Sequence, residues 1–179
     1  MKKTFTLVAL ATALLSTSAV AQSTGEKTGI NSTLGIAPTT ADFIKEAATS
    51  DMLEIAAAKI AEQKGDAQEK TFASQMITDH SKTTTELNQM VSGSEKTALP
   101  TALDDASEKK LDRLKAAKPE DFAAEYDPMQ VSAHKDATSL FERYSNGGED
   151  PKLKDWAGKT LPALQHHLEM AQDMNKNRK

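Results

Sequence analysis

Residues 41–69 read ADFIKEAATSDMLEIAAAKIAEQKGDAQE, and this stretch decides the fold. Its first part, up to residue 64, contains strong helix formers and neither glycine nor proline, with apolar side chains at the spacing of a helical face. Gly65 then ends the helix, and Asp66 with Glu69 three residues later matches a capping box that begins another. The stretch predicts two long helices joined by a tight turn, with Thr40 as the cap of the first.

The same pattern continues outward through the rest of the chain. The second helix runs to about Val91, a short charged helix follows over about 104–116, and a third long helix opens at Pro119. The break SNGGEDP, residues 145–151, separates it from a fourth helix that ends at about Asn177. No segment shows the alternation of a strand. The sequence therefore predicts an all-α fold, a four-helix bundle with an additional short helix in the connection between helices 2 and 3.

The order of the helices in space stays open at this stage. The connection over residues 92–118 is long enough for a crossover along the bundle, as in ferritin-like folds. It also permits an up-down-up-down arrangement. Pro128 is expected to kink the third helix or to mark its true start, and Pro162 to bend the fourth.

The beginning of the chain predicts export. Lys2 and Lys3 precede an apolar run too short to span a bilayer, and Ala19-Val20-Ala21 is a cleavage pattern for a signal peptidase. We expect residues 1–21 to be a cleaved signal peptide. Residues 22–39, rich in Gly, Ser and Thr, are expected to be a flexible segment, and residues 40–177 to be the helical bundle domain.

Composition narrows the classes of partner and of chemistry. The chain has no cysteine, which excludes disulfides, thiolate metal sites, cysteine nucleophiles and a lipoprotein anchor. Loss of Lys2 and Lys3 with the signal changes the net charge from −4 to −6, which argues against nucleic acid as a partner. No later stretch reaches transmembrane length. These features predict a soluble periplasmic protein of a Gram-negative envelope, whose partner would be another envelope protein and whose oligomeric state the sequence does not indicate.

Two adjacent histidines in the fourth helix must point in different directions. Neighbouring residues on a helix lie about 100° apart. The residues three and four positions from His167 are mostly apolar, whereas those around His166 are mostly polar. We expect His167 to face the core and His166 to face solvent.

The same test finds one inward polar residue on each of the other long helices. Glu54, His80 and His134 all have small or apolar neighbours one turn away. At about 1.5 Å per residue, these three and His167 fall near one level of the bundle. Three imidazoles and a carboxylate suit zinc, iron, copper or manganese. The sequence therefore predicts a transition-metal site made by these four residues.

We expect Asp79 and Gln130 to form hydrogen bonds to the ligand side chains and so orient them, without binding the metal themselves. A metal-free alternative is a structural or interaction protein in which the same Glu and His side chains form a buried polar network. A third alternative is an oxidoreductase or hydrolase with an open metal position, but no nucleophile, phosphate loop or dinucleotide motif indicates an enzyme. Ferritin-type oxidase chemistry is not expected, because the residues three positions before the inward histidines are Ile77, Val131 and Leu164 rather than glutamate.

Four segments carry a resemblance to a known family. They are ADFIKEAATSDMLEIAAAKIA, FASQMITDHS, YDPMQVSAH and DPKLKDWAGKTLPALQHHLEMA. They resemble the domain of unknown function 4142 family, exported bacterial proteins that are often labelled outer-membrane proteins and grouped with ferritin-like folds. The family pattern matches Glu54, Asp79-His80, His134, Leu161-Pro162 and His167-Leu168 over about residues 40–174. The resemblance implies a fold and export, and no established reaction. The outer-membrane label fits poorly with a sequence that has neither barrel strands nor a lipid-attachment cysteine.

Overall fold

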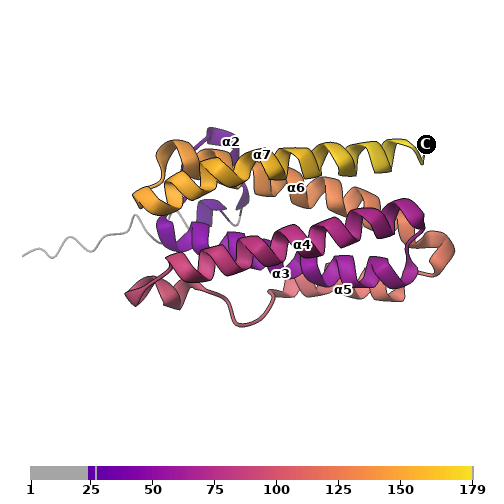
Figure 1. Ribbon diagram of the computed structural model, residues 1–179. Helices are drawn as coiled ribbons and strands as arrows, with labels where there is room; N and C mark the ends of the chain where they lie inside the picture. The colour runs from indigo at the N-terminus through magenta and orange to yellow at the C-terminus, as the bar shows by residue number, and fades with distance from the viewer. Residues whose placement is uncertain (1–23, 27, 179) are drawn as a thin grey trace, which may run out of the picture.

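The computed structural model describes residues 24–26 and 28–178, and every regular element in these residues is a helix (Figure 1). In chain order the elements are α2 (Ile30–Leu34), α3 (Thr40–Lys64), α4 (Ala67–Met90), the 3₁₀ helix η1 (Gly93–Ala98), α5 (Asp105–Ala116), the 3₁₀ helix η2 (Pro119–Asp121), α6 (Phe122–Gly147) and α7 (Pro151–Lys176). The predicted all-α class, the long helices and the short helix between them are confirmed. The predicted signal peptide, residues 1–21, lies outside the described residues.

One local prediction about a helix start was wrong, and one of the two alternatives given for Pro128 is excluded. The cap of α3 is Thr39, whose hydroxyl accepts a hydrogen bond from the backbone N–H of Asp42 at 3.1 Å. The hydroxyl of Thr40 instead lies 2.9 Å from that of Tyr144, because Thr40 is already inside the helix. Pro128 does not mark the start of α6, since the helix begins at Phe122 and continues through the proline.

The turn between α3 and α4 has the structure that the sequence predicted. The Asp66 side chain accepts hydrogen bonds from the backbone N–H groups of Gln68 and Glu69, and the Glu69 carboxylate accepts one from the N–H of Asp66 at 2.6 Å. This is the predicted capping box. A Cβ atom on Gly65 would lie 2.7 Å from the carbonyl oxygen of Ala61. Only glycine lets the two helices reverse direction so closely.

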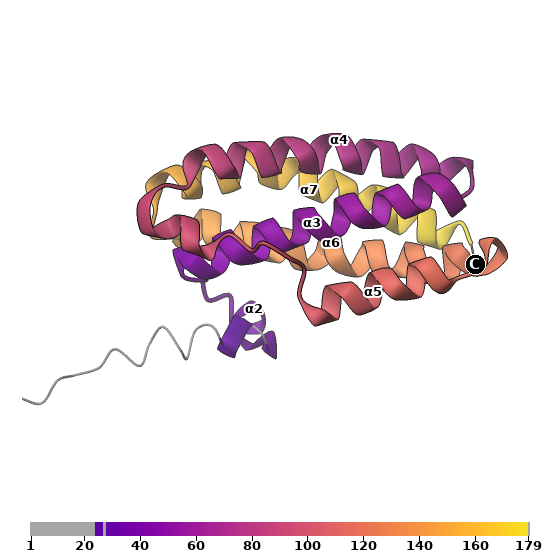
Figure 2. The same ribbon diagram turned by 90° about the horizontal axis from the view of Figure 1, so that it is seen from below.

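The four long helices pack as two antiparallel pairs, α3 with α4 and α6 with α7 (Figure 1). Helices α4 and α6 run in the same direction. Phe72 near the start of α4 contacts Tyr126 near the start of α6, and Leu87 shares a core cluster with Phe141 towards their ends. The connection between α4 and α6 therefore crosses the length of the molecule, and α5 lies along α3 and α6 on its way (Figure 2).

The core consists of two apolar clusters with a polar layer between them. One cluster surrounds Phe43, whose ring stacks on that of Tyr144 with centroids 3.9 Å apart, and the other surrounds Phe72 at the opposite end. On α7, Leu164 belongs to the first cluster and Ala171 to the second. The predicted inward residues of the four helices lie in the layer between the clusters, and they are Glu54, His80, His134 and His167.

The segment before α3 packs against α6. The Arg143 guanidinium holds the Glu26 carboxylate through two hydrogen bonds of 2.7 and 2.9 Å, and it also donates to the carbonyl oxygen of Ile36. The flexibility expected of residues 22–39 stays a prediction from composition. None of the described helices combines the length and the apolar character needed to cross a membrane.

Candidate metal centre

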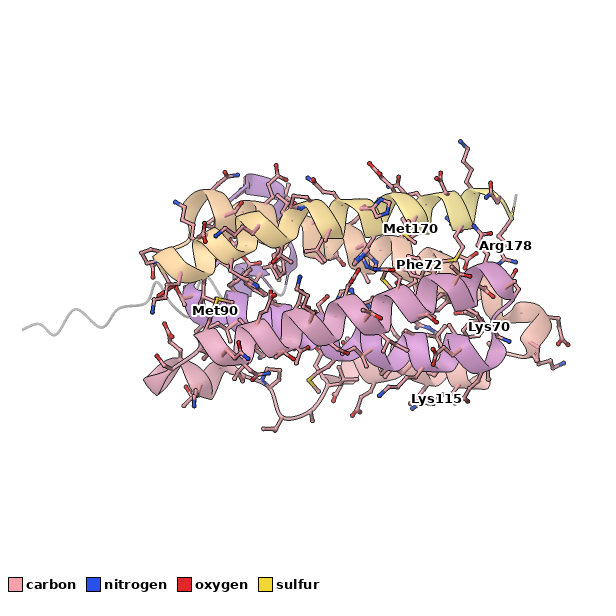
Figure 3. All side chains as sticks on the ribbon, viewed as in Figure 1. Lys70, Phe72, Met90, Lys115, Met170 and Arg178 are labelled. Carbon is pink, nitrogen blue, oxygen red and sulfur yellow. The ribbon has the colours of Figure 1, made fainter. Side chains whose placement is uncertain are left out.

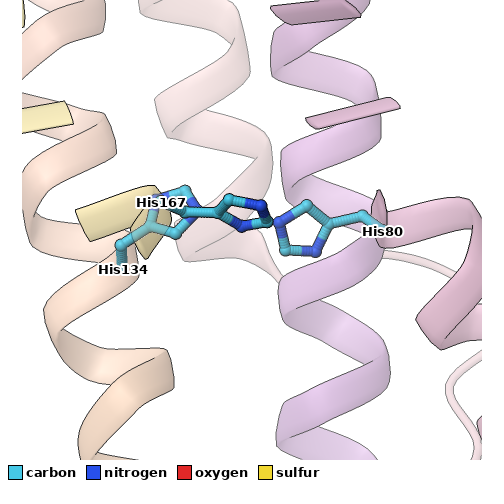
Figure 4. A group of neighbouring side chains, drawn as sticks. All are labelled: His80, His134 and His167. Carbon is cyan, nitrogen blue, oxygen red and sulfur yellow. The ribbon is translucent and has the colours of Figure 1, made fainter. Parts of the chain in front are cut away.

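Three histidines from three different helices meet in the polar layer. His80 comes from α4, His134 from α6 and His167 from α7, and each is at most 3% exposed. One nitrogen of each ring lies within 4.8 Å of a nitrogen of each of the others. The ring centroids are 5.7, 5.6 and 5.5 Å apart, which makes a nearly equilateral triangle. Figure 4 shows the three rings pointing toward one another.

Two of the rings are held by carboxylates. His80 Nδ1 lies 2.8 Å from Asp51 Oδ1, and His167 Nε2 lies 2.8 Å from Asp79 Oδ2. A carboxylate only accepts, so the ring nitrogen in each pair donates its proton. His80 Nε2 and His167 Nδ1 have no hydrogen-bond partner among the described residues. In the neutral rings these two buried nitrogens therefore carry lone pairs.

The third ring is held by the backbone of its own helix. His134 Nδ1 donates to the carbonyl oxygen of Gln130 at 3.0 Å, one turn earlier in α6. This leaves His134 Nε2 buried and without a hydrogen-bond partner in the part of the chain that the structure describes. All three rings thus have one nitrogen fixed by an acceptor and one free, which is the usual arrangement of histidines that bind metals.

Burial and the neighbouring charges separate the pKa values of the three rings. Burial lowers the pKa of His167 to about 4, although Asp79 acts in the opposite direction. Burial also lowers the pKa of His134. Burial would lower the pKa of His80 as well, but the hydrogen bond to Asp51 and its charge raise it above the ordinary value. His134 and His167 are consequently neutral at pH 7, the form that binds a metal.

Glu54 supplies a buried carboxylate beside this triangle. The residue is 1% exposed, and neither carboxylate oxygen has a hydrogen-bond partner among the described residues. Its charge raises the pKa of both His80 and His134, so it lies close enough to act on both rings. It does not belong to the group formed by the three histidines, whose nitrogens lie within 4.8 Å of one another. A buried carboxylate without a donor is costly, and a neighbouring cation would compensate it.

The structure also places the two supporting residues named from the sequence. Asp79 holds the His167 ring, and Gln130 holds His134 through its backbone carbonyl rather than its side chain. The Gln130 amide is fully buried and makes no hydrogen bond with the described residues. His166, next to His167, has a side chain that is 68% exposed and lies 3.8 Å from Glu169. The predicted difference between the two adjacent histidines is confirmed.

Sequence reasoning missed Asp51. Its carboxylate is buried, holds His80, and accepts hydrogen bonds of 2.8–3.0 Å from the hydroxyls of Thr83 and Thr84. The signal was present, because Asp51 precedes Glu54 by three residues and so shares its face of α3. The two threonines likewise follow His80 by three and four residues.

The geometry is suited to a single metal ion. Two ligands bound tetrahedrally at about 2.0–2.1 Å from zinc lie roughly 3.4 Å apart. The histidine nitrogens lie within 4.8 Å of one another, so small side-chain rotations would bring them to that spacing. The group formed by His80, His134 and His167 could therefore hold a metal.

Comparison with known proteins agrees with the resemblance seen in the sequence. The family model described as "Domain of unknown function (DUF4142)" matches residues 25–174, which include every residue of the centre. No curated protein and no solved structure matches the chain. The match covers most of the sequence, and the chain therefore belongs to the DUF4142 family.

Proposed function

We propose that this protein is an exported, periplasmic metal-binding protein that holds one transition-metal ion in the core of a ferritin-like four-helix bundle. The ligands are His80 Nε2, His134 Nε2 and His167 Nδ1, and the Glu54 carboxylate completes the set. Its role is to retain or buffer the metal in the cell envelope, where it protects against metal stress. The ferritin-like description rests on the antiparallel pairs and the long crossover between α4 and α6.

The main support for the proposal is the hydrogen bonding of the three imidazole rings. Each has one nitrogen bonded to Asp51, Asp79 or a backbone carbonyl, and one buried nitrogen that has no hydrogen-bond partner among the described residues. A network that served only to fix the helices would be expected to use these atoms, because each unmade hydrogen bond costs about 1–3 kcal/mol. A metal ion uses all three lone pairs at once.

The donor set favours some metals over others. Imidazole nitrogen suits zinc, copper and iron, whereas manganese prefers oxygen, so we expect zinc or copper to bind most tightly. With Glu54 as the fourth ligand, the site is closed, and a closed four-ligand site retains its metal instead of activating water. This geometry supports a binding role over catalysis.

The test is metal stoichiometry in matched histidine variants. Chain purified from the periplasm is stripped with a chelator, titrated with Zn²⁺ and assayed by calorimetry and elemental analysis. We expect one ion per wild-type chain, retention in His166→Ala, and loss of at least 100-fold in affinity in His134→Ala and His167→Ala. Glu54→Gln should weaken binding while keeping the histidine-dependent ion.

The metal-free alternative makes the opposite expectation. If His134→Ala and His166→Ala bind zinc equally, or if the wild type takes up less than about one ion in ten chains, the metal proposal is wrong. The buried residues would then be a polar network of a structural or interaction protein.

A further inference from the structure

Solvent reaches one residue of the metal centre more than the others. The three histidines, Asp51 and Glu54 are each at most 6% exposed, and Gln130 is fully buried. The side chain of Asp79, which holds the His167 ring, is 30% exposed. A metal ion that approaches the centre from solvent while the helices stay packed therefore meets Asp79 first.

Asp79 lies at one end of a groove between α4 and α7, which has a volume of about 640 Å³. On α7 the groove begins at Ala163, one turn before His167, and its far end is lined by Lys152 and by Met90, which Figure 3 labels at the end of α4. Asp79 and Met90 are 11 residues apart, which is about 16 Å along the helix. A water molecule takes up about 30 Å³ in the liquid, so the groove has room for an ion with its bound waters.

The groove stays open because short side chains line it between two hydrogen bonds that join α4 and α7. One bond links Asp79 to His167 beside the centre, and further along the Trp156 indole donates to Glu86 Oε2 at 2.8 Å. The residues that line the groove between these bonds are Thr83, Thr160 and Ala163. Their side chains are too short to fill the space between the helices, and the groove therefore reaches the level of the histidines.

The walls of the groove carry balanced charge. Its lining contains three lysines and three acids, which are Lys82, Lys152, Lys159, Asp79, Glu86 and Asp155. Lys82 Nζ lies 3.8 Å from Glu86 Oε1, and Lys159 Nζ lies 2.5 Å from Asp155 Oδ2. These two pairs neutralise each other's charge along the groove, so a cation is not repelled from its inner part and meets the negative charge of Asp79 there.

One oxygen of Asp79 is available to an ion in the groove. Asp79 Oδ2 accepts hydrogen bonds from His167 Nε2 at 2.8 Å and from the Gln75 amide at 2.6 Å. Asp79 Oδ1 makes no hydrogen bond with the residues that the structure describes. Carboxylate oxygen is a ligand for zinc. Asp79 can thus contact an arriving ion before its bond to His167 opens.

We propose that this groove is the route by which the metal ion enters and leaves the histidine centre, and that the Asp79 carboxylate is the first group of the centre to contact the ion. The bond between Asp79 and His167 then has to open for the ion to pass, because it joins the two helices at the inner end of the groove. This inference rests on the proposed function, since it concerns access to the same three histidines.

A second hollow, of about 430 Å³, lies between α3, α5 and α6 and supplies a control. Its lining includes Leu53 and Ala133, the neighbours of Glu54 and His134 in the chain. None of its lining residues forms or orients the metal centre. An ion in this hollow would still be separated from the histidines by packed side chains.

The test blocks the groove with a label. The chain has no cysteine, so Ala163→Cys can be labelled at a single position, either with small iodoacetamide or with bulky N-pyrenylmaleimide. Both labels are uncharged, and both remove the thiol as a zinc ligand. Metal-free protein is mixed with Zn²⁺ in a stopped-flow instrument, and release is followed with a coloured chelator. We expect the bulky label to slow uptake and release about 10-fold relative to the small one at unchanged Kd, because it raises the barrier without changing either end state.

Two further variants test the route and its first contact. Ala106→Cys, at an exposed position lining the second hollow, carries the same two labels and should show equal rates with both. Asp79→Asn should slow Zn²⁺ uptake about threefold, because the arriving cation loses the negative charge that attracts it. A residue that only oriented His167 would change release and leave uptake as it is.

The rates and the stoichiometry separate this inference from the proposed function. If the chain binds one ion at rates that are equal for the two labels on Ala163→Cys, the route is wrong and the metal site stands. Slowing by the bulky label on Ala106→Cys, or unchanged uptake in Asp79→Asn, would overturn the route as well. Failure of the wild-type chain to bind zinc would overturn both the proposed function and the route.

Discussion

Each histidine of the centre is oriented through one ring nitrogen, and this determines which nitrogen can bind a metal. Helical spacing predicted that His167 points inward and His166 outward, because side chains three and four residues away report the face of a helix. It could not predict the tautomers. They depend on contacts between helices, such as the bond from His80 to Asp51 across α3 and α4, which no spacing within one helix encodes.

The bond between Asp79 and His167 gives a prediction at this scale. Asp79→Asn should lower the affinity for Zn²⁺ by about 10–100-fold, because a neutral amide stabilises the metal-bound imidazole less than a carboxylate does. The side chain of Asp79 is 30% exposed, so the fold should tolerate the change. Competition with a coloured chelator measures the affinity. Asp155→Asn, which alters an exposed ion pair with Lys159, is the control, and equal affinities in the two variants would contradict a role for Asp79.

Helix boundaries followed from caps and breaks in the sequence to within a few residues. Helix α3 was expected over 41–64 and occupies Thr40–Lys64, because glycine and the capping box fix its end. The N-terminal cap was displaced by one residue where two threonines are adjacent. The short helices α2 and η1 were not predicted, because each has too few residues to show a period.

Gly65, in the turn after α3, and Gly158, inside α7, should respond to alanine in opposite ways. Gly65→Ala should lower the free energy of unfolding by about 1–3 kcal/mol, because the new Cβ would meet the backbone oxygen of Ala61 at 2.7 Å. Gly158→Ala should raise it by about 0.5–1 kcal/mol, since its Cβ would lie 3.7 Å from Ser145 inside a helix. Urea denaturation of both variants checks this, and a Gly65→Ala chain as stable as the wild type would refute the close approach.

At the scale of the whole molecule, the sequence predicted the four long helices and the short helix between them, but not their order in space. The crossover and the up-down-up-down arrangement both fit a connection of that length and both bring the four inward residues near one level. Packing decides between them. Leu111 and Leu114 of α5 join the core cluster of Phe72 and Phe122, which directs the connection along α3 and α6 towards the far end. Contacts between segments far apart in the chain produce no periodic pattern in the sequence, so the order of the helices could not be predicted from it.

Among the groups whose pKa changes on folding, His167 and Asp127 should act on the stability of the metal-free protein in opposite directions as pH changes. The folded pKa of His167 is about 4, below its ordinary 6.5, so the unfolded chain binds more protons between these values and the free energy of unfolding rises with pH there. The folded pKa of Asp127 is about 6, above its ordinary 3.8, so the folded chain binds more protons and the free energy of unfolding falls as pH rises from about 4 to 6. The two slopes oppose each other in the wild type.

Replacing His167 and Asp127 one at a time should therefore change the slope of the unfolding free energy against pH in opposite directions. Relative to wild type, His167→Asn should lose up to about 3 kcal/mol of unfolding free energy as pH rises from 4 to 6, and Asp127→Asn should gain a similar amount. Urea denaturation with a chelator, at half-unit pH steps, measures the difference. Constant offsets from lost packing or from the ion pair between Arg178 and Asp127 cancel, since only the slope is compared. Profiles that run parallel to the wild type would mean that neither group changes its protonation on folding in this range.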